Sequence, residues 1–173
     1  MVRNRWFRAL AASFALLAAA VAPAQVKIAV INVQRAVLDT AEIKKAQTEL
    51  EAKYKGRQEA VLKLQSEIQT IQNQLQTMAG KLTPQAEQEL TAQGQKKQRE
   101  YQRLSEDLQA DVDRDRNDIL SRASQRMQEA VKKLAEERGY DIVVDFGDAV
   151  YFKPALDITK DAVAAYDKAY PVK

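Results

Sequence analysis

The sequence predicts a mainly α-helical protein with a small β body, from which a long antiparallel helical hairpin, or coiled-coil arm, projects. One observation is an apolar heptad pattern over residues 61–82. A second long helical pattern follows a turn that contains Gly80 and Pro84. Short β-branched runs stand near both ends of the chain. These strands are too few for a stable sheet, so we expect the body to assemble from several copies of the chain, as a trimer in the interpretation developed below.

The first long helix is predicted from about residue 41 to residue 79. Its apolar residues recur at alternating steps of three and four, which places them in one narrow seam. Read backwards, the same spacing reaches Tyr54, Leu50 and Ile43, with polar residues at Gln47 and Arg57. Gly56 interrupts this part and indicates a bend, a close approach of another element, or a tolerated glycine. The seam of this helix comprises Ile43, Leu50, Val61, Leu64, Ile68, Ile71, Leu75, Met78 and Leu82.

The return helix is predicted from about residue 85 to Arg138, and Gly139 is the residue expected to end it. Its apolar residues recur at steps of eleven, which favours a nearly straight pairing. They include Leu104, Leu108, Val112 and Ile119, the predicted seam of this helix. A fold about residue 82 brings Leu50 near Asn117 and lets both helices end together at the base. At 1.5 Å per residue, the arm is expected to be roughly 60 Å long.

The body is predicted from the segments that flank the arm. Strands are expected at 26–33, 140–145 and 149–152, the last two as a hairpin around Phe146-Gly147-Asp148, and a final helix at 160–170. The domain division is therefore a leader at 1–24, a body formed by 25–40 and 139–173, and an arm at 41–138 with its tip near 80–84. Self-association is expected through the strands, at Val26, Ile28, Val30, Ile142, Val144, Val150 and Tyr151.

The first 24 residues resemble a secretory signal peptide. Arg3, Arg5 and Arg8 precede a short apolar run that ends in Ala22-Pro23-Ala24. Cleavage there predicts export from the cytoplasm, with the periplasm as the compartment that the family resemblance below implies. Removing these three arginines from the 27 basic residues leaves 24, equal to the 24 acidic residues. The mature charge therefore gives no argument for nucleic acid as a partner, and it does not favour a membrane surface.

Catalytic and metal chemistry have little support in the sequence. The chain contains neither Cys nor His, which excludes thiol nucleophiles, histidine bases and the usual zinc sites. The acidic run from Asp111 to Asp118 begins like a calcium loop, but Arg116 and Arg122 occupy the positions that need Gly and Glu. Interleaved Arg instead indicates an ion-paired helix surface. Asp141 and Asp145 lack a third orienting group. We expect no enzymatic activity and no cofactor.

Several motifs together resemble the Skp/OmpH family of periplasmic chaperones. They are the Lys27-Ile28-Ala29-Val30 strand, Lys55-Gly56-Arg57 in the arm, Tyr140-Asp141-Ile142-Val143-Val144-Asp145, Ala149-Val150-Tyr151 and Asp157-Ile158-Thr159. The resemblance implies a homotrimer whose strands build a shared β body. It also implies that three arms enclose a cavity in which unfolded outer-membrane proteins are held without ATP.

The first functional hypothesis is therefore an ATP-independent periplasmic holdase that binds unfolded outer-membrane proteins and prevents their aggregation. The alternative is a structural or adaptor coiled-coil protein of the cell envelope. Near the tip, basic residues slightly outnumber acidic ones, and this mixed surface could hold a client weakly. The client-contact candidates are Met78, Leu82, Lys96, Lys97, Arg99 and Arg103.

Overall fold

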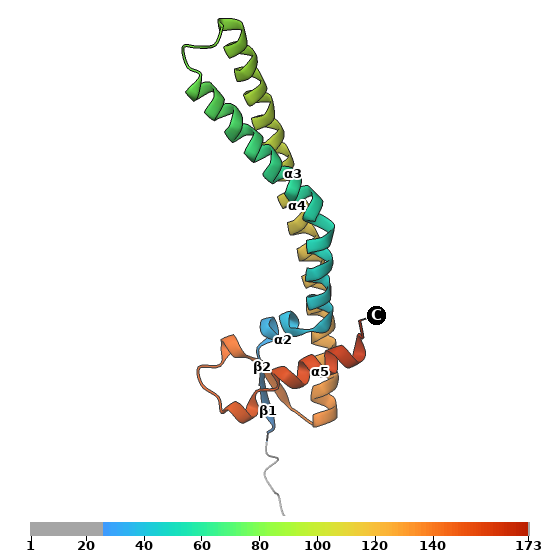
Figure 1. Cartoon of the computed structure of the whole chain (residues 1–173). Helices are drawn as coiled ribbons and strands as arrows, with labels where there is room; N and C mark the ends of the chain where they lie inside the picture. Colours follow the sequence, from blue (N-terminus) through green and yellow to red (C-terminus); the bar gives the residue numbers. More distant parts are fainter. Residues whose placement is uncertain (1–25, 173) are drawn as a thin grey trace, which may run out of the picture.

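The computed structural model describes residues 26–172 as a small body with one long arm (Figure 1). The predicted fold class is confirmed, because two long helices form the arm and the sheet is small. In chain order the elements are β1 (Ile28–Ile31), α2 (Val33–Asp39), α3 (Ala41–Thr77), α4 (Pro84–Arg138), β2 (Ile142–Asp145), the 3-10 helices η1 (Phe146–Asp148) and η2 (Pro154–Leu156), and α5 (Thr159–Ala169).

The arm consists of α3 and α4, which run antiparallel to each other. The hydroxyl of Thr40 accepts a hydrogen bond from the Ile43 N–H at 3.3 Å and caps α3. Gly80 adopts φ 74° in the loop at the tip, a backbone conformation that few other residues reach without strain. The Thr83 hydroxyl then caps α4, and Pro84 occupies its first turn. Local sequence thus sets both the start of the arm and its reversal.

Helix α4 continues beyond the arm and supplies one wall of the body core. Ala123, Met127, Ala130 and Leu134 recur at steps of four and three and are all buried. They pack against buried residues of β1, α2, α3 and α5, which include Ile31, Ala36, Val37, Ile43, Ile158, Ala162 and Tyr166. Gly139 ends α4 with φ 65°, as its position after the apolar pattern predicted.

The two strands of the body are parallel neighbours, with Ile28 opposite Ile142 and Ile31 opposite Asp145. Parallel strands need a crossover connection, and here the whole arm forms part of that connection. On the other side of β1, the Ile158 N–H donates to the Val30 carbonyl at 2.9 Å. The side chains of Asp145 and Thr159 accept hydrogen bonds from the N–H groups of Val33 and Asn32, respectively. Residues from the two ends of the chain are therefore joined into one body.

The predicted hairpin at 140–152 is wrong. Only Ile142–Asp145 is a strand; residues 146–148 form a 3-10 helix, and 149–153 form no helix or strand. The Asp145 carboxylate accepts from the Gly147 N–H at 2.9 Å and turns the chain away from a tight hairpin. Val150 and Tyr151 consequently have no strand partner in the described chain and are 106% and 82% exposed.

The first strand is also shorter than predicted. It begins at Ile28, so Val26 lies outside it and is 59% exposed. Burial along the strand does not alternate from one residue to the next, because Ala29, Val30 and Ile31 are all buried and Ile28 is not. These three residues are buried because β2 and the segment before α5 lie along the two edges of β1. Residues of α2, α4 and α5 pack in the same core.

Candidate functional site

The arm is the largest surface that the body does not need for its own core, and its seam is shallow. On α3, five predicted seam positions are buried: Ile43, Tyr54, Leu64, Ile68 and Ile71. The remaining apolar seam positions Leu50, Val61, Leu75, Leu82, Leu104, Leu108, Val112 and Ile119 are only partly buried. A two-helix pair covers each seam residue on one side only, so such partial burial is expected. Much apolar surface along the arm thus stays close to solvent.

The two helices approach each other closely at Gly94. A Cβ atom placed on Gly94 would lie 3.1 Å from Cγ2 of Ile71. Close by, the Lys97 ammonium pairs with the Glu67 carboxylate at 2.5 Å across the arm. At Gly56, by contrast, nothing lies within 4 Å of a Cβ built there. Of the three interpretations of Gly56, the close approach of another element is therefore wrong.

A group of polar side chains, here called the mid-arm belt, joins the helices halfway along the arm. It comprises Lys53, Tyr54 and Arg57 of α3 with Asp111 and Asp115 of α4. Asp115 accepts from the Lys53 ammonium at 2.5 Å and from the Tyr54 hydroxyl at 2.7 Å. Asp111 accepts from Arg57 at 2.7 Å and also pairs with Arg114. Two of the four aspartates in the predicted acidic run, Asp111 and Asp115, are thus paired with neighbouring cations.

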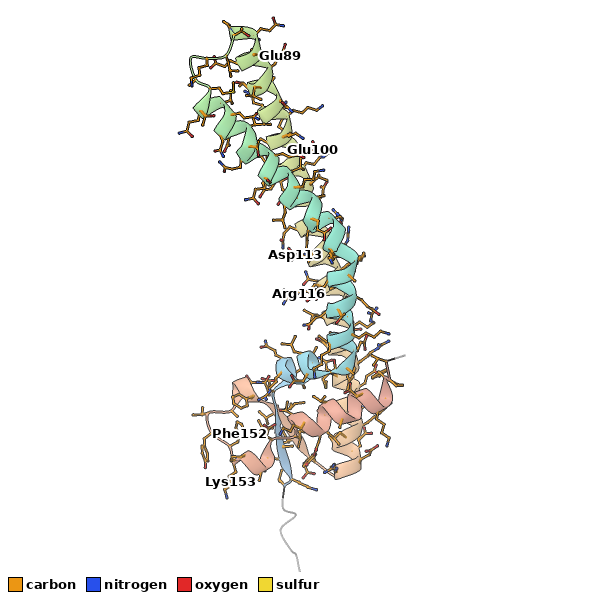
Figure 2. All side chains as sticks on the ribbon, viewed as in Figure 1. Glu89, Glu100, Asp113, Arg116, Phe152 and Lys153 are labelled. Atoms are coloured by element: carbon orange, nitrogen blue, oxygen red, sulfur yellow. The ribbon has the colours of Figure 1, made fainter. Side chains whose placement is uncertain are left out.

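Hydrogen bonds within the mid-arm belt lower the pKa values of its two aspartates. Hydrogen bonds from Lys53 and Tyr54 hold the pKa of Asp115 below its usual range. The hydrogen bond from Arg57 does the same for the pKa of Asp111. In Figure 2 the labelled Asp113 and Arg116 lie at the level where the arm changes direction. The bend therefore coincides with the part of the seam in which polar contacts replace apolar ones.

A second group of charged residues, here called the Glu42 cluster, lies at the root of the arm. Glu42 of α3 accepts hydrogen bonds from Arg126 of α4 at 2.8 and 3.0 Å. Its carboxylate also accepts from the Tyr166 hydroxyl of α5 at 2.5 Å and pairs with Arg122 at 3.4 Å. Burial alone would raise the pKa of Glu42, but the hydrogen bonds from Tyr166 and Arg126 outweigh it and lower the pKa. Three helices therefore converge on one ionised carboxylate.

Sequence reasoning missed the Glu42 cluster. Glu42 lies in the first turn of α3, where an acidic residue is common because it interacts with the helix dipole. Its partners follow 80 or more residues later in the sequence, and Tyr166 lies in the predicted final helix at 160–170. A visible signal would have been two arginines at i and i+4, Arg122 and Arg126, on an otherwise core-facing part of α4.

Two grooves flank α3 at the arm root. One, of about 430 Å³, has a lining that includes Leu38, Ile43, Leu50, Ile119 and Leu120 together with Glu51 and Arg116. We call it the root groove. Leu38 of α2 is 47% exposed there. The other, of about 400 Å³, is more polar and includes Glu42, Lys45, Arg122 and Arg126. The root groove is large enough to take an apolar side chain.

The predicted client-contact candidates differ in their availability. Met78 is 43% exposed, and Lys96, Arg99 and Arg103 are exposed on α4. Leu82 is half-buried in the tip loop. Lys97 is half-buried and paired with Glu67, so its charge is already engaged within the arm. Lys97 is therefore the least available cation of this group.

The predicted self-association residues gather on the body. Ile28 and Ile142 face each other across the sheet and are 41% and 49% exposed. Val150 and Tyr151 lie on the loop that also carries Phe152 and Lys153. Figure 2 shows these last two residues on the side of the body opposite the C-terminal end of α5. Val30 is 3% exposed and belongs to the subunit's own interior, and Val144 is half-buried. The exposed apolar surface of the body thus comes mainly from the other five residues of the set.

Within residues 26–172, no helix combines the length and apolar character needed to cross a lipid bilayer. The same residues contain no group of three acidic side chains placed to bind a metal ion.

These features define a class of protein in which a long helical-hairpin arm projects from a small body. Residues 27–166 match the sequence profile of the family described as Outer membrane protein (OmpH-like). The chaperone protein Skp of Yersinia enterocolitica is 32% identical over 164 residues, which cover 92% of this chain and 97% of that protein. A Skp-like protein of Pseudomonas aeruginosa is 27% identical, with 86% and 89% covered. The chain therefore belongs to the OmpH-like family.

The fold has a counterpart among solved structures. An OmpH-like outer membrane chaperone from Caulobacter crescentus superposes with a TM-score of 0.68 over 87% of this chain and 89% of that one. The sequences share 20% identity, so this likeness concerns the fold alone. Because the superposition covers 87% of this chain, it extends over both the body and the arm.

Proposed function

We propose that this protein is an ATP-independent periplasmic holdase that binds unfolded outer-membrane proteins between the arms of a homotrimer and prevents their aggregation. The observation that carries the proposal is the arm, a pair of helices of 37 and 55 residues whose distal part contacts nothing else in the described chain. Membership of a family whose relatives are named Skp chaperones supports the same function.

Weak, distributed binding explains how such an arm would act. Its partly buried seam and its mixed surface charges offer many small contacts and no deep pocket. The root groove adds apolar side chains together with a carboxylate and a guanidinium. An unfolded barrel segment alternates apolar and polar side chains, so it could place one side chain in the groove while its backbone meets the charged groups. Several such contacts per assembly would raise the affinity through multivalency.

Self-association is supported by the body. A two-stranded sheet is marginally stable by itself, and β2 has one strand neighbour in the described chain. Its other edge can pair with a second copy. Exposed Val150, Tyr151 and Phe146 lie near this edge in sequence and would be covered by assembly. In the expected homotrimer, the three arms would enclose a shared space.

The periplasm is the proposed compartment. The leader predicted at 1–24 lies outside the described residues, so the support comes from its Arg-rich start, its short apolar run and the family. An envelope location also fits a holdase that works without ATP.

The test is light scattering from an unfolded β-barrel protein diluted out of urea. One trimer per client should suppress the scattering to the same extent with and without ATP. Leu38→Glu should weaken suppression because it places a charge in the root groove. Leu62→Glu is the matched control, because Leu62 is 63% exposed and is not part of that groove. Unchanged scattering with the unaltered protein would refute the holdase function.

A second measurement separates the proposal from an adaptor role. Size exclusion with mass determination should show three chains per particle, and one unfolded barrel protein should join that particle. Capture of one folded partner, with no preference for the unfolded barrel, would favour the structural adaptor. A mass corresponding to one chain at micromolar concentration would contradict the trimer.

A further inference from the structure

The root of the arm is held at two different places. Helix α4 runs without interruption from the arm into the core, where Ala123 and Met127 are fully buried. Helix α3 enters the body only with its first turn, where Thr40 and Ile43 are buried and Glu42 stands between them in sequence. One arm helix thus continues through the core, and the other joins the body at its first turn.

Helix α5 forms hydrogen bonds with the first turn of α3. The Tyr166 hydroxyl donates to the Glu42 carboxylate at 2.5 Å, and the Asp167 carboxylate accepts from the Ala41 N–H at 3.0 Å. Arg126 of α4 donates to both oxygens of Glu42, and its guanidinium lies 4.9 Å from the centre of the Tyr170 ring of α5. The Glu42 side chain is 15% exposed, so water competes weakly for these contacts.

The mechanics of a helix pair give this attachment a purpose. When two parallel rods bend together, the rod on the outer side must slide along its neighbour unless their ends are fixed. The tip loop already joins α3 to α4 at the far end of the arm. A second fixed point at the root would prevent sliding and would make the pair stiffer than either helix alone.

We propose that the Glu42 cluster fixes the first turn of α3 to α4 and α5, and thereby limits bending of the arm relative to the body. Glu42 and Tyr166 are then positioning residues, which act on the arm and need not touch a client. The consequence for client binding rests on the proposed function, whereas the consequence for the arm does not. Arms of restricted direction would keep the space between them at a defined width.

The chain is well suited to a direct measurement because it contains no cysteine. Gln102→Cys on α4 and Lys160→Cys on α5 introduce two exposed labelling sites, one on the arm and one on the body. The doubly labelled chain is refolded with an excess of unlabelled chain, so that an assembly carries one labelled copy. Pulsed electron spin resonance then gives the distribution of arm-to-body distances.

Glu42→Ala and Tyr166→Phe should both broaden this distribution. The amides of the first turns of α3 should also exchange hydrogen roughly ten- to a hundredfold faster, as expected for the loss of a charge-assisted hydrogen bond. Tyr166→Phe retains the buried ring, so it remains decisive if Glu42→Ala does not fold. The matched control is Glu49→Ala, because Glu49 lies on the same helix and pairs with Lys45, one turn away on that helix, at 3.6 Å.

An unchanged distribution in Tyr166→Phe, or equal broadening in Glu49→Ala, would overturn the proposal. A client assay in parallel distinguishes the two levels of inference. Failure of the unaltered protein to suppress aggregation would refute the holdase function while the distance measurement still tested the attachment. Broadening with reduced suppression in Glu42→Ala would support both.

Discussion

The root and the distal half of the arm are built from the same two helices but are stabilised in different ways. At the root, Met127 and Ala123 are completely buried and Ile43 is 2% exposed. In the distal half, Leu64, Ile68 and Ile71 are buried on α3 but Leu75 is only partly buried, and ion pairs such as Lys97 to Glu67 supplement the seam. The difference teaches that a helix can belong to a rigid core at one end and to a loosely held pair at the other.

A gradient of stability along the arm follows from this difference. Local opening requires little free energy where few apolar groups are buried and where ion pairs are exposed to water. The tip should therefore open more often than the root. For a surface that must adapt to many unfolded chains, such a gradient supplies both attachment and adjustment.

The largest expected effect comes from emptying the root core. Met127→Ala should lower the free energy of unfolding by about 3 kcal/mol, because it removes a fully buried side chain and leaves a cavity. Leu75→Ala in the distal seam should cost only about 1 kcal/mol. Urea denaturation at one fixed protein concentration measures both, since assembly couples to stability. Equal losses in the two variants would contradict the comparison.

The next effect concerns the charge of Glu42 and its dependence on pH. At pH 7, Glu42→Gln should be less stable than the unaltered protein by about 2 kcal/mol, the size expected for charge-assisted hydrogen bonds in a mostly buried site. The pKa of Glu42 lies below its ordinary value of 4.5. As the pH falls below that value, the unfolded chain takes up the proton first, so the advantage shrinks and disappears below the folded-state pKa.

Thermal unfolding of both proteins from pH 7 to pH 3 checks this prediction. The two melting curves should converge on acidification, with most of the change below pH 4.5. A difference between them that stays constant over the whole range would show that the Glu42 charge is not the cause.

Two glycines offer a smaller and more local comparison. Gly56→Ala should stabilise the arm by about 0.5–1 kcal/mol, because alanine favours the helix and meets no atom within 4 Å. Gly94→Ala gains the same propensity but places its Cβ 3.1 Å from Ile71. It should therefore be the less stable of the two variants. Hydrogen exchange of the distal arm resolves the comparison, and a more stable Gly94→Ala would show that Ile71 yields without cost.

The smallest effect is expected in the mid-arm belt. Arg57→Gln removes the pair with Asp111, whose two side chains are 40% and 32% exposed. Water and salt screen such a pair, so the loss should be smaller than in Glu42→Gln and should vanish in 1 M salt. Helicity measured during heating at low and high salt tests this. A salt-independent loss would indicate that the Arg57 stem acts through packing instead.

Local patterns were sufficient for the arm. The spacing of Leu64, Ile68 and Ile71 predicted a helix and its buried face, while Gly139 predicted a helix end that the structure contains. The matching lengths of the two helical stretches predicted their antiparallel pairing. Each inference depends on residues within a few turns of one another, which is why the sequence alone determined the arm and the fold class.

Contacts between distant residues decided the remainder. Residues 149–152 have a strand-like composition but no strand partner in the described chain, and Asp145 directs the preceding segment into a 3-10 helix. The parallel pairing of β1 with β2 and the close approach at Gly94 likewise depend on three-dimensional placement. Glu42 meets Tyr166 across 124 positions of sequence, and no local period connects them. Tertiary structure was therefore needed to show how the arm is attached, since attachment joins separate segments.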